Sequence, residues 1–516
     1  MALRTRGAAD RDTPPPVGKD VRIVFCGLLV ITFMAMMDQA VVATAGPTVA
    51  GELGGLDGYA WVFVAYMLAF GAVMPVYGKV GDLLGRGPVL VFALVTFLLG
   101  SAACGLAGSM GELIAFRLVQ GLGGGGLAVL AMAIVGELLE PRQRARYQGV
   151  FTVVFATASI AGPAVGGLVT EALGWRWVFF LNLPIGAVAL LLVVERLRLP
   201  VRTVRPVRVD AVGAVLLGGV VTGLVLVTTW GGTRYAWTSP ETLGLAGGTL
   251  TLAAAWLVVE RRAVEPLVPL RLFKDSTFAL ANLIALLSSL ALFGVLNFLP
   301  LFLQLGSGVT VSYSALLMVA ALVGMTGASL VAGQIIYRTG RYKWAPVLSM
   351  ALGTVALLLL STCTAQTDEL VVAAHLTVLG TAAGLSQQTV TLAAQNTAPR
   401  GDFGVVTSTV AFSRNVGALF GNALFGAILT ARLAVELPER SPLPHGASAD
   451  LSPERLTELP QQALDGLATA CTDALSTVFL CAAPVLASGF GAALLMRNLP
   501  LRRATGERQH RPGTEE

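Results

Sequence analysis

Long apolar stretches separated by short polar gaps run along almost the whole chain. Reading the stretches of helical length gives fourteen candidate spans, each near the roughly 20 residues that a helix needs to cross a bilayer. Their predicted limits are 23–47, 60–78, 88–107, 111–136, 147–171, 177–195, 210–230, 241–259, 277–304, 313–337, 344–364, 370–393, 403–431 and 475–496. No segment alternates apolar and polar residues as a strand of a transmembrane barrel does. The pattern predicts an all-α, multi-pass membrane protein.

The basic residues are distributed unequally among the polar gaps. If the amino terminus lies inside, the two tails and every second gap are cytoplasmic, and these segments hold 28 of the 35 lysines and arginines. Such an excess is typical of cytoplasmic loops. The distribution predicts that both termini are cytoplasmic. Two of the remaining arginines, Arg117 and Arg414, fall within predicted spans.

The start of the chain also imitates a cleavable signal peptide, because a basic segment and an apolar stretch precede the sequence ATA at 43–45. The apolar stretch is long enough for a full span, and it contains Asp38. We therefore interpret it as the first membrane span.

Composition supports a membrane protein and offers little sign of a cofactor. Of the 516 residues, 55% are hydrophobic and only 13% are charged, whereas soluble proteins carry about 25% charged residues. The five cysteines form no CxxC pair and the three histidines are scattered, so we expect no metal site and no cofactor. Only four of the basic residues are lysine, which is typical of a GC-rich bacterial genome. We expect a bacterial plasma membrane protein with no nucleic-acid partner.

Two gaps between spans repeat one pattern. GKVGDLLGR (78–86) and GQIIYRTGR (333–341) both read glycine, six residues, glycine, arginine. Each becomes the second gap of a six-span unit if one helix pair is left out between the units. The repeat predicts a duplicated bundle with an inserted pair, an architecture of one large transporter class. The predicted divisions are a tail at 1–22, a bundle at 23–195, the inserted pair with its loops at 196–276, a second bundle at 277–496 with an outer loop at 432–474, and a tail at 497–516.

The residues of the first turn suit a latch between helices. Gly78 and Gly85 allow helix ends to approach closely and the chain to reverse. Asp82 can accept hydrogen bonds from a helix N-terminus or pair with Arg86. The second turn has Tyr337 in place of the aspartate. The alternative is a short loop whose arginines merely follow the positive-inside rule.

Several motifs occur in an order that resembles the major facilitator superfamily, and within it the fourteen-span drug/proton antiporters of EmrB/QacA type. The matching segments are MDQAVVATAGP (37–47), GKVGDLLGRGPVL (78–90), RLVQGLGGG (117–125), GPAVGG (162–167), WRWVFFLNLPIG (175–186), AQNTAPRGDFG (394–404) and FSRNVGALFG (412–421). The chain departs from the family pattern at Ala43, Gly46 and Gly87. The resemblance implies two six-helix bundles plus two inserted helices. It also implies a monomeric, proton-coupled exporter of hydrophobic small molecules, such as a multidrug or antibiotic efflux protein.

Asp38 is the only acid well inside an apolar stretch, and such groups are usually functional. At 1.5 Å per residue it lies roughly 13 Å below the outer end of its span, and Arg117 lies roughly 9 Å below the outer end of the fourth. The two side chains can therefore meet if these spans are neighbours. We predict that the pair couples transport to protons; a static ion pair is the alternative.

The fifth span contains GPAVGG, the motif that the family associates with antiporters. Pro163 removes a backbone hydrogen bond and tends to kink the helix, and Gly162, Gly166 and Gly167 allow close approach of a neighbour. The segment is a candidate hinge or seal. Kinked packing without a switching role is equally consistent with the sequence.

Further polar residues within or beside spans are candidates for a substrate cavity: Gln120, Gln304, Gln388, Arg414 and Asn415. Helix–helix hydrogen bonding is an alternative for the amides. Because the family shares an arginine near position 414, a structural role is the favoured reading for Arg414.

Two other functions remain open from sequence alone. The chain could export a specific metabolite, or it could act as a non-transporting membrane sensor. A membrane enzyme would need clustered histidine, aspartate or cysteine at one depth, and the sequence offers none. The predicted function is therefore transport rather than catalysis.

Overall fold

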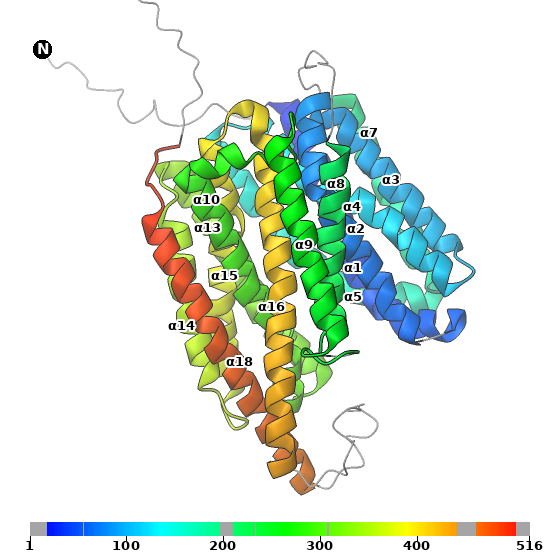
Figure 1. Cartoon of the computed structure of the whole chain (residues 1–516), viewed down its shortest axis with the longest axis vertical. Helices are drawn as coiled ribbons and strands as arrows, with labels where there is room; N and C mark the ends of the chain where they lie inside the picture. The colour runs from blue at the N-terminus through cyan, green and yellow to red at the C-terminus, as the bar shows by residue number, and fades with distance from the viewer. Residues whose placement is uncertain are drawn as a thin grey trace, which may run out of the picture.

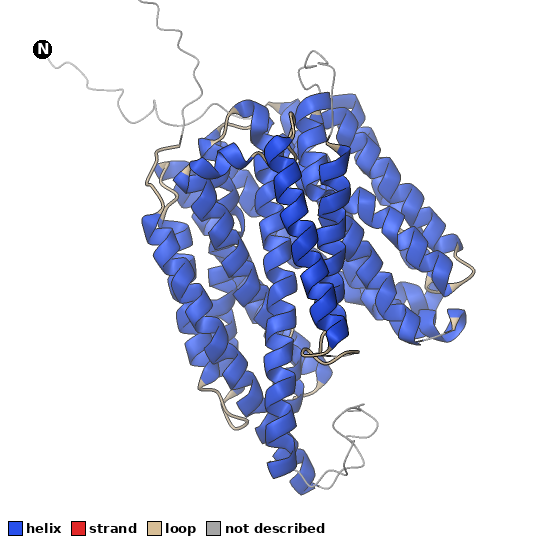
Figure 2. Ribbon diagram, in the orientation of Figure 1, coloured by secondary structure: helices blue, strands red, loops and turns tan. Residues whose placement is uncertain are grey.

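The computed structural model describes residues 18–54, 56–196, 210–232, 234–306, 309–440 and 461–501. These residues are almost entirely helical (Figure 2). Within them, 14 helical segments are long and apolar enough to cross a membrane, so the predicted all-helical, fourteen-span fold is confirmed.

The amino-terminal half (α1–α7) supplies the first six spans. Its helices are α1 (Lys19–Leu53), α2 (Leu56–Leu84), α3 (Arg86–Leu106), α4 (Met110–Leu138), α5 (Pro141–Leu173), α6 (Arg176–Phe180) and α7 (Asn182–Arg196), of which the last two form one span. The chain reverses between helices at glycines with positive φ, among them Gly54, Gly85 and Gly174. Glycine occupies these positions because it has no Cβ to clash there.

The inserted pair consists of α8 (Ala211–Trp230) and α9 (Pro240–Arg262). Asp210 and Ser239 cap these helices by accepting hydrogen bonds from the amides of Gly213 and Thr242. A connecting segment, residues 263–275, leads from α9 to the next half and contains the short 3₁₀ helix η1 (Leu270–Lys274).

The carboxy-terminal half (α10–α18) supplies the last six spans. Its elements are α10 (Ser276–Ser288), η2 (Ser289–Phe293), α11 (Gly294–Leu296), α12 (Leu299–Leu301), η3 (Phe302–Gly306), α13 (Val311–Thr339), α14 (Trp344–Ser361), α15 (Glu369–Thr397), η4 (Arg400–Asp402), α16 (Phe403–Arg440) and α18 (Gln461–Leu495). The segments η2 and η3 are π-helical turns within the ninth span. Pro300, which lacks an amide hydrogen, lies between them and helps to interrupt the helix.

The segment 432–474, predicted to be an outer loop between two spans, is helical at both ends. The helix α16 continues to Arg440 and α18 begins at Gln461, so only 441–460 lies outside the described residues of this segment. The early turns of α18 bury Leu467, Cys471 and Ala474. This burial stabilises helix beyond the membrane-spanning length, which an apolar-run criterion does not detect.

The helices cross in alternation, so each turn lies on one of two sides (Figure 1). We call the side at which α1 begins the N side and the opposite side the far side. The two halves meet where α5 contacts α13 and α2 contacts α16. On the flank of this seam, α8 contacts both α2 and α16, whereas α9 packs on α8. Only 6% of the residues in the apolar part of α9 are buried, against 72% in α4, so α9 lies at the outside of the described helices.

The connecting segment 263–275 is anchored to both halves. Glu265 accepts a hydrogen bond of 2.5 Å from Lys79 Nζ at the N-side end of α2. Arg271 forms an ion pair of 3.0 Å with Asp402, immediately before α16. The segment therefore crosses the seam between α2 and α16 on the N side.

Candidate functional site

A fully buried ion pair lies inside the amino-terminal half. Arg117 Nη1 on α4 donates a hydrogen bond of 2.6 Å to Asp38 Oδ2 on α1, and both side chains are 0% exposed. The two predicted partners are therefore in contact, because α1 and α4 pack against each other. Their role in proton coupling remains a prediction.

Two amides complete the surroundings of the Asp38 carboxylate. Its Oδ1 accepts hydrogen bonds of 2.8 Å from Gln120 Nε2 and 2.7 Å from Asn182 Nδ2. Gln120 also accepts a 2.7 Å bond from Arg117 Nη1. Three donors thus replace the water that an ionised carboxylate loses on burial, as a buried charge requires.

Sequence reasoning placed Gln120 among the cavity candidates and missed Asn182. The structure instead places Gln120, which is fully buried, beside Asp38. Asn182 belongs to the WRWVFFLNLPIG segment, and an amide within an apolar span was the available signal. It also donates to Ser101 Oγ at 2.9 Å, so the network joins α1, α3, α4 and α7.

Two residues of α2 also contact the side chain of Arg117. It lies 4.2 Å from the ring centroid of Tyr66 on α2, and its Nε donates to the Val62 carbonyl oxygen at 3.4 Å. Protonation of Asp38 would remove the charge that balances this buried cation.

The first repeated turn forms a second ionic cluster, on the N side. Arg86, the first residue of α3, pairs with Asp82 near the end of α2 and donates a 2.6 Å hydrogen bond to Glu137 Oε2 on α4. Gly85 has φ +93°, so the chain can reverse between α2 and α3 without strain. The cluster fixes three helix ends of the amino-terminal half.

Asp82 also reaches across the seam to the other half. Its Oδ1 and Oδ2 accept hydrogen bonds of 2.9 Å each from the amides of Gly404 and Val405, at the N-terminus of α16. A Cβ at Gly78 would lie 2.6 Å from the Gly404 carbonyl oxygen and 2.2 Å from Ser408 Oγ. The missing side chain at 78 therefore lets the two helices approach closely enough for Asp82 to cap α16.

The fifth-span motif packs against α1. A Cβ at Gly162 would lie 2.4 Å from Ala40 Cβ, and one at Gly166 would lie 2.2 Å from Thr44 Oγ1. Gly167 has no such neighbour within 4 Å. Pro163 lies inside α5, as predicted from the sequence. Two of the three glycines thus bring α5 onto the segment of α1 that follows Asp38.

The other four cavity candidates do not converge on one site. Gln304 lies on η3 at the far side, whereas Gln388 lies on α15 beside a cavity of about 10 Å³ between the halves. Arg414 donates to the Gln387 carbonyl oxygen and, at 3.2 Å, to Thr391 Oγ1. Asn415 faces Gly71 of α2. Arg414 therefore joins α16 to α15, which fits the structural role expected for it.

On the far side, a partly exposed ion pair joins the end of α1 to α6. Glu52 pairs with Arg176 and accepts a 2.7 Å hydrogen bond from Trp175 Nε1. Hydrogen bonding from Arg176 holds the pKa of Glu52 below its ordinary value.

Comparison with known proteins identifies relatives across nearly the whole chain. The sequence profile of the Major Facilitator Superfamily matches residues 28–422. An uncharacterized MFS-type transporter of Mycobacterium tuberculosis is 38% identical over 484 residues, which cover 93% of this chain and 70% of the relative. The multidrug transporter protein MdtP of Bacillus subtilis is 37% identical over 410 residues, covering 80% and 75%.

Solved structures share the fold at low sequence identity. The human organic anion transporter TETRAN superposes with a TM-score of 0.60 at 17% identity, covering 92% of this chain and 100% of that chain. The proton:xylose symporter XylE gives 0.58 at 12%, covering 91% and 95%.

Proposed function

The chain belongs to the major facilitator superfamily, and we propose that it is a proton-coupled exporter of hydrophobic small molecules. A relative named as a multidrug transporter, 37% identical to this chain, supports the substrate class. The observation that carries the proton coupling is the buried Asp38–Arg117 pair, in which a deep carboxylate is balanced by one cation and two amides.

The coupling would run from Asp38 to the packing of α1. When Asp38 takes up a proton, its attraction to Arg117 falls and the two amides lose an ionised acceptor. The helix α1 is then less firmly held to α4 and α7. Because Gly162 and Gly166 pack α5 onto α1, and α5 contacts α13, movement of α1 has a direct route to the seam between the halves.

We propose that the N side is cytoplasmic, since the segments on that side carry most of the lysines and arginines. The described contacts between α2 and α16 through Asp82 would then close the cytoplasmic entrance. In this conformation a substrate between the halves would leave toward the far side, the direction that export requires.

The proposed units are the bundles at 23–195 and 277–496, the inserted pair at 196–276, and tails at 1–22 and 497–516. The contacts of α8 with the outside of the α2–α16 seam, and the position of α9 at the outside of the described helices, support a peripheral insertion. We propose a monomer in a bacterial plasma membrane as the working unit.

The decisive experiment compares two neutralised acids in proteoliposomes with an imposed proton gradient. Asp38→Asn should abolish proton-driven drug efflux, while the protein still inserts and binds drug. Asp82→Asn should slow efflux but leave it dependent on the gradient. Full efflux by Asp38→Asn, with undiminished dependence on the gradient, would remove Asp38 from the mechanism.

A further inference from the structure

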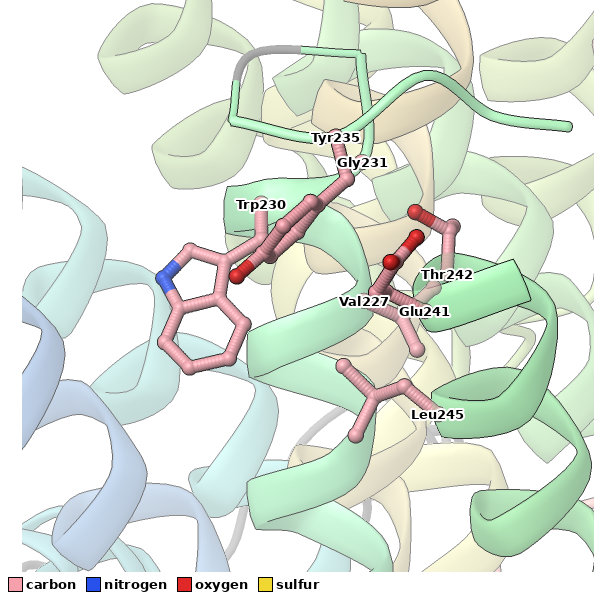
Figure 3. Close-up of a pocket in the computed structure, with 7 residues that line it drawn as sticks. All are labelled: Val227, Trp230, Gly231, Tyr235, Glu241, Thr242 and Leu245. Carbon is pink, nitrogen blue, oxygen red and sulfur yellow. The ribbon is translucent and has the colours of Figure 1, made fainter. Parts of the chain in front are cut away.

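A pocket outside the seam between the halves lies at the far-side ends of α8 and α9. Its volume is about 290 Å³. Trp230 and Tyr235 lie on one side of it, with Glu241 and Thr242 on the other (Figure 3). The apolar side chains of Val227 and Leu245 also line it. The inserted pair alone supplies these residues, so the pocket is separate from the substrate route proposed above.

The lining combines two aromatic rings with a carboxylate. Aromatic faces attract organic cations, and quaternary ammonium groups are recognised in this way. Glu241 is exposed at the first turn of α9 and forms no ion pair within the part of the chain that the structure describes. Its charge is therefore available to a cation that enters the pocket.

The two rings already hold a cation of the chain itself. The guanidinium carbon of Arg234 lies 5.3 Å from the Trp230 ring centroid and 5.6 Å from that of Tyr235. Arg234 is exposed, so its side chain can move into water at little cost. Its positive charge lies close to the pocket, so it would oppose the entry of a second cation.

A backbone hydrogen bond and an aromatic contact hold the described residues beside the pocket. Gly232 N donates a 2.8 Å hydrogen bond to the Tyr235 carbonyl oxygen, and Gly232 has φ +77°. Trp230 also makes an edge contact with Trp61 of α2, at 5.9 Å between centroids. The rings are therefore positioned before any ligand arrives, which lowers the entropy cost of binding.

We propose that this pocket binds a small organic cation through its alkylammonium group. The ammonium would lie against the rings of Trp230 and Tyr235, and Glu241 would balance its charge. The site would be reached from the far side and would bind whether or not transport occurs. Its failure would therefore leave the proposed export function untouched.

Choline is a suitable probe, because 3,3-dimethylbutanol has nearly the same shape without the charge. The full-length protein is placed in nanodiscs of phosphatidylglycerol, and binding is followed by calorimetry. We expect choline to bind at least ~10-fold more tightly than the neutral compound, as expected for a cation–π contact with a nearby carboxylate. Equal binding, or no binding of choline, would overturn the proposal.

Variants distinguish the pocket from adventitious binding. Glu241→Gln and Trp230→Leu should each weaken choline binding by about 5-fold or more. Glu171→Gln removes another exposed carboxylate on the far side and should change nothing. Arg234→Ala should tighten binding, because it removes a positive charge close to the pocket. Damage to the fold cannot produce that gain, and unchanged or weaker binding by Arg234→Ala would contradict the proposed charge recognition.

A second lipid composition identifies the source of the ammonium group. If lipid headgroups occupy the pocket, nanodiscs containing phosphatidylcholine should weaken the apparent binding of free choline relative to phosphatidylglycerol alone. If the ligand is a free cation, the two compositions should give the same affinity. Loss of the choline preference in phosphatidylglycerol nanodiscs would contradict both versions.

Discussion

Each copy of the repeated turn allows a helix of one half to pack closely on a helix of the other half, but only the first copy carries a charge at that contact. In the first, Gly78 lets α2 approach α16; in the second, a Cβ at Gly333 would lie 2.5 Å from the Ala145 carbonyl oxygen of α5. Both glycines thus remove a side chain where a helix of one half meets a helix of the other. Only the first copy adds a carboxylate, since Tyr337 occupies the position equivalent to Asp82.

The difference follows from what each opposing helix lacks. The N-terminus of α5 has its own capping box, formed by Glu140 and Gln143. The amides of Gly404 and Val405 at the start of α16 are instead satisfied by Asp82 from the other half. The charge occurs where helix amides need an acceptor, so the two turns share the steric element and only the first has the electrostatic element.

Neutral hydrogen bonds join the halves on the α5 side of the seam. Ser329 Oγ donates to Thr152 Oγ1 at 2.9 Å, and Gln148 Nε2 donates to Gln395 Oε1 at 3.3 Å. Neutral bonds are weaker than charge-assisted ones. The α2–α16 contact and the α5–α13 contact should therefore contribute unequally to closing the N side.

Removing the charge of the first turn should have the largest effect. Asp82→Asn weakens two charge-assisted bonds across the seam, which we expect to cost about 2–4 kcal/mol of the closed conformation. Cysteine accessibility on the N side should rise and transport should slow, while equilibrium drug binding stays within a few-fold. Tyr337→Phe is the matched change in the second turn and should alter neither. Loss of drug binding by a folded Asp82→Asn protein would contradict a latch.

Restoring a side chain to either glycine should have an intermediate effect. Gly78→Ala and Gly333→Ala each force a helix pair apart against backbone oxygen, at a cost of roughly 1–3 kcal/mol. Distance measurements between spin labels on α2 and α16, or on α5 and α13, should show the affected seam widening. Gly327→Ala is the control, because nothing lies within 4 Å of its Cβ position. Unequal effects of the first two changes would mean that the steric element is not shared.

Removing the neutral hydrogen bond between Ser329 and Thr152 should have the smallest effect. Thr152→Val with Ser329→Ala deletes donor and acceptor together, so no buried group is left unpaired. We expect a change of about 0.5–1.5 kcal/mol in the closed conformation, measured by the same accessibility assay and apportioned by a double-mutant cycle. An effect as large as that of Asp82→Asn would show that the α5–α13 contact stabilises the closed conformation as much as the α2–α16 contact does, against the prediction.

The sequence could predict the fourteen spans because a bilayer demands a fixed apolar length, and it could pair Asp38 with Arg117 because depth follows from helix rise. Depth does not give the rotation of each helix about its axis, so Gln120 was assigned to a cavity and Asn182 was missed. The extended ends of α16 and α18 lie beyond the bilayer-length criterion. The bond between Asp82 and α16 needed knowledge of which helices meet across the halves, and no spacing within one half supplies that.

The connecting segment 263–275 has a consequence for how salt should affect the protein. Opening the N side would separate α2 from α16 and would therefore strain the two anchors of the segment, at Lys79 and Asp402. In the Arg271–Asp402 pair the side chains are 68% and 19% exposed, and in the Lys79–Glu265 pair they are 9% and 42% exposed. Dissolved ions screen the more exposed Arg271–Asp402 pair more strongly, over a Debye length of about 8 Å at physiological ionic strength. The Arg271–Asp402 pair should therefore break first. The inserted helices would then move with the amino-terminal half in each transport cycle. The transport rate should then depend on ionic strength through the Arg271–Asp402 ion pair, which lies outside the proposed substrate route.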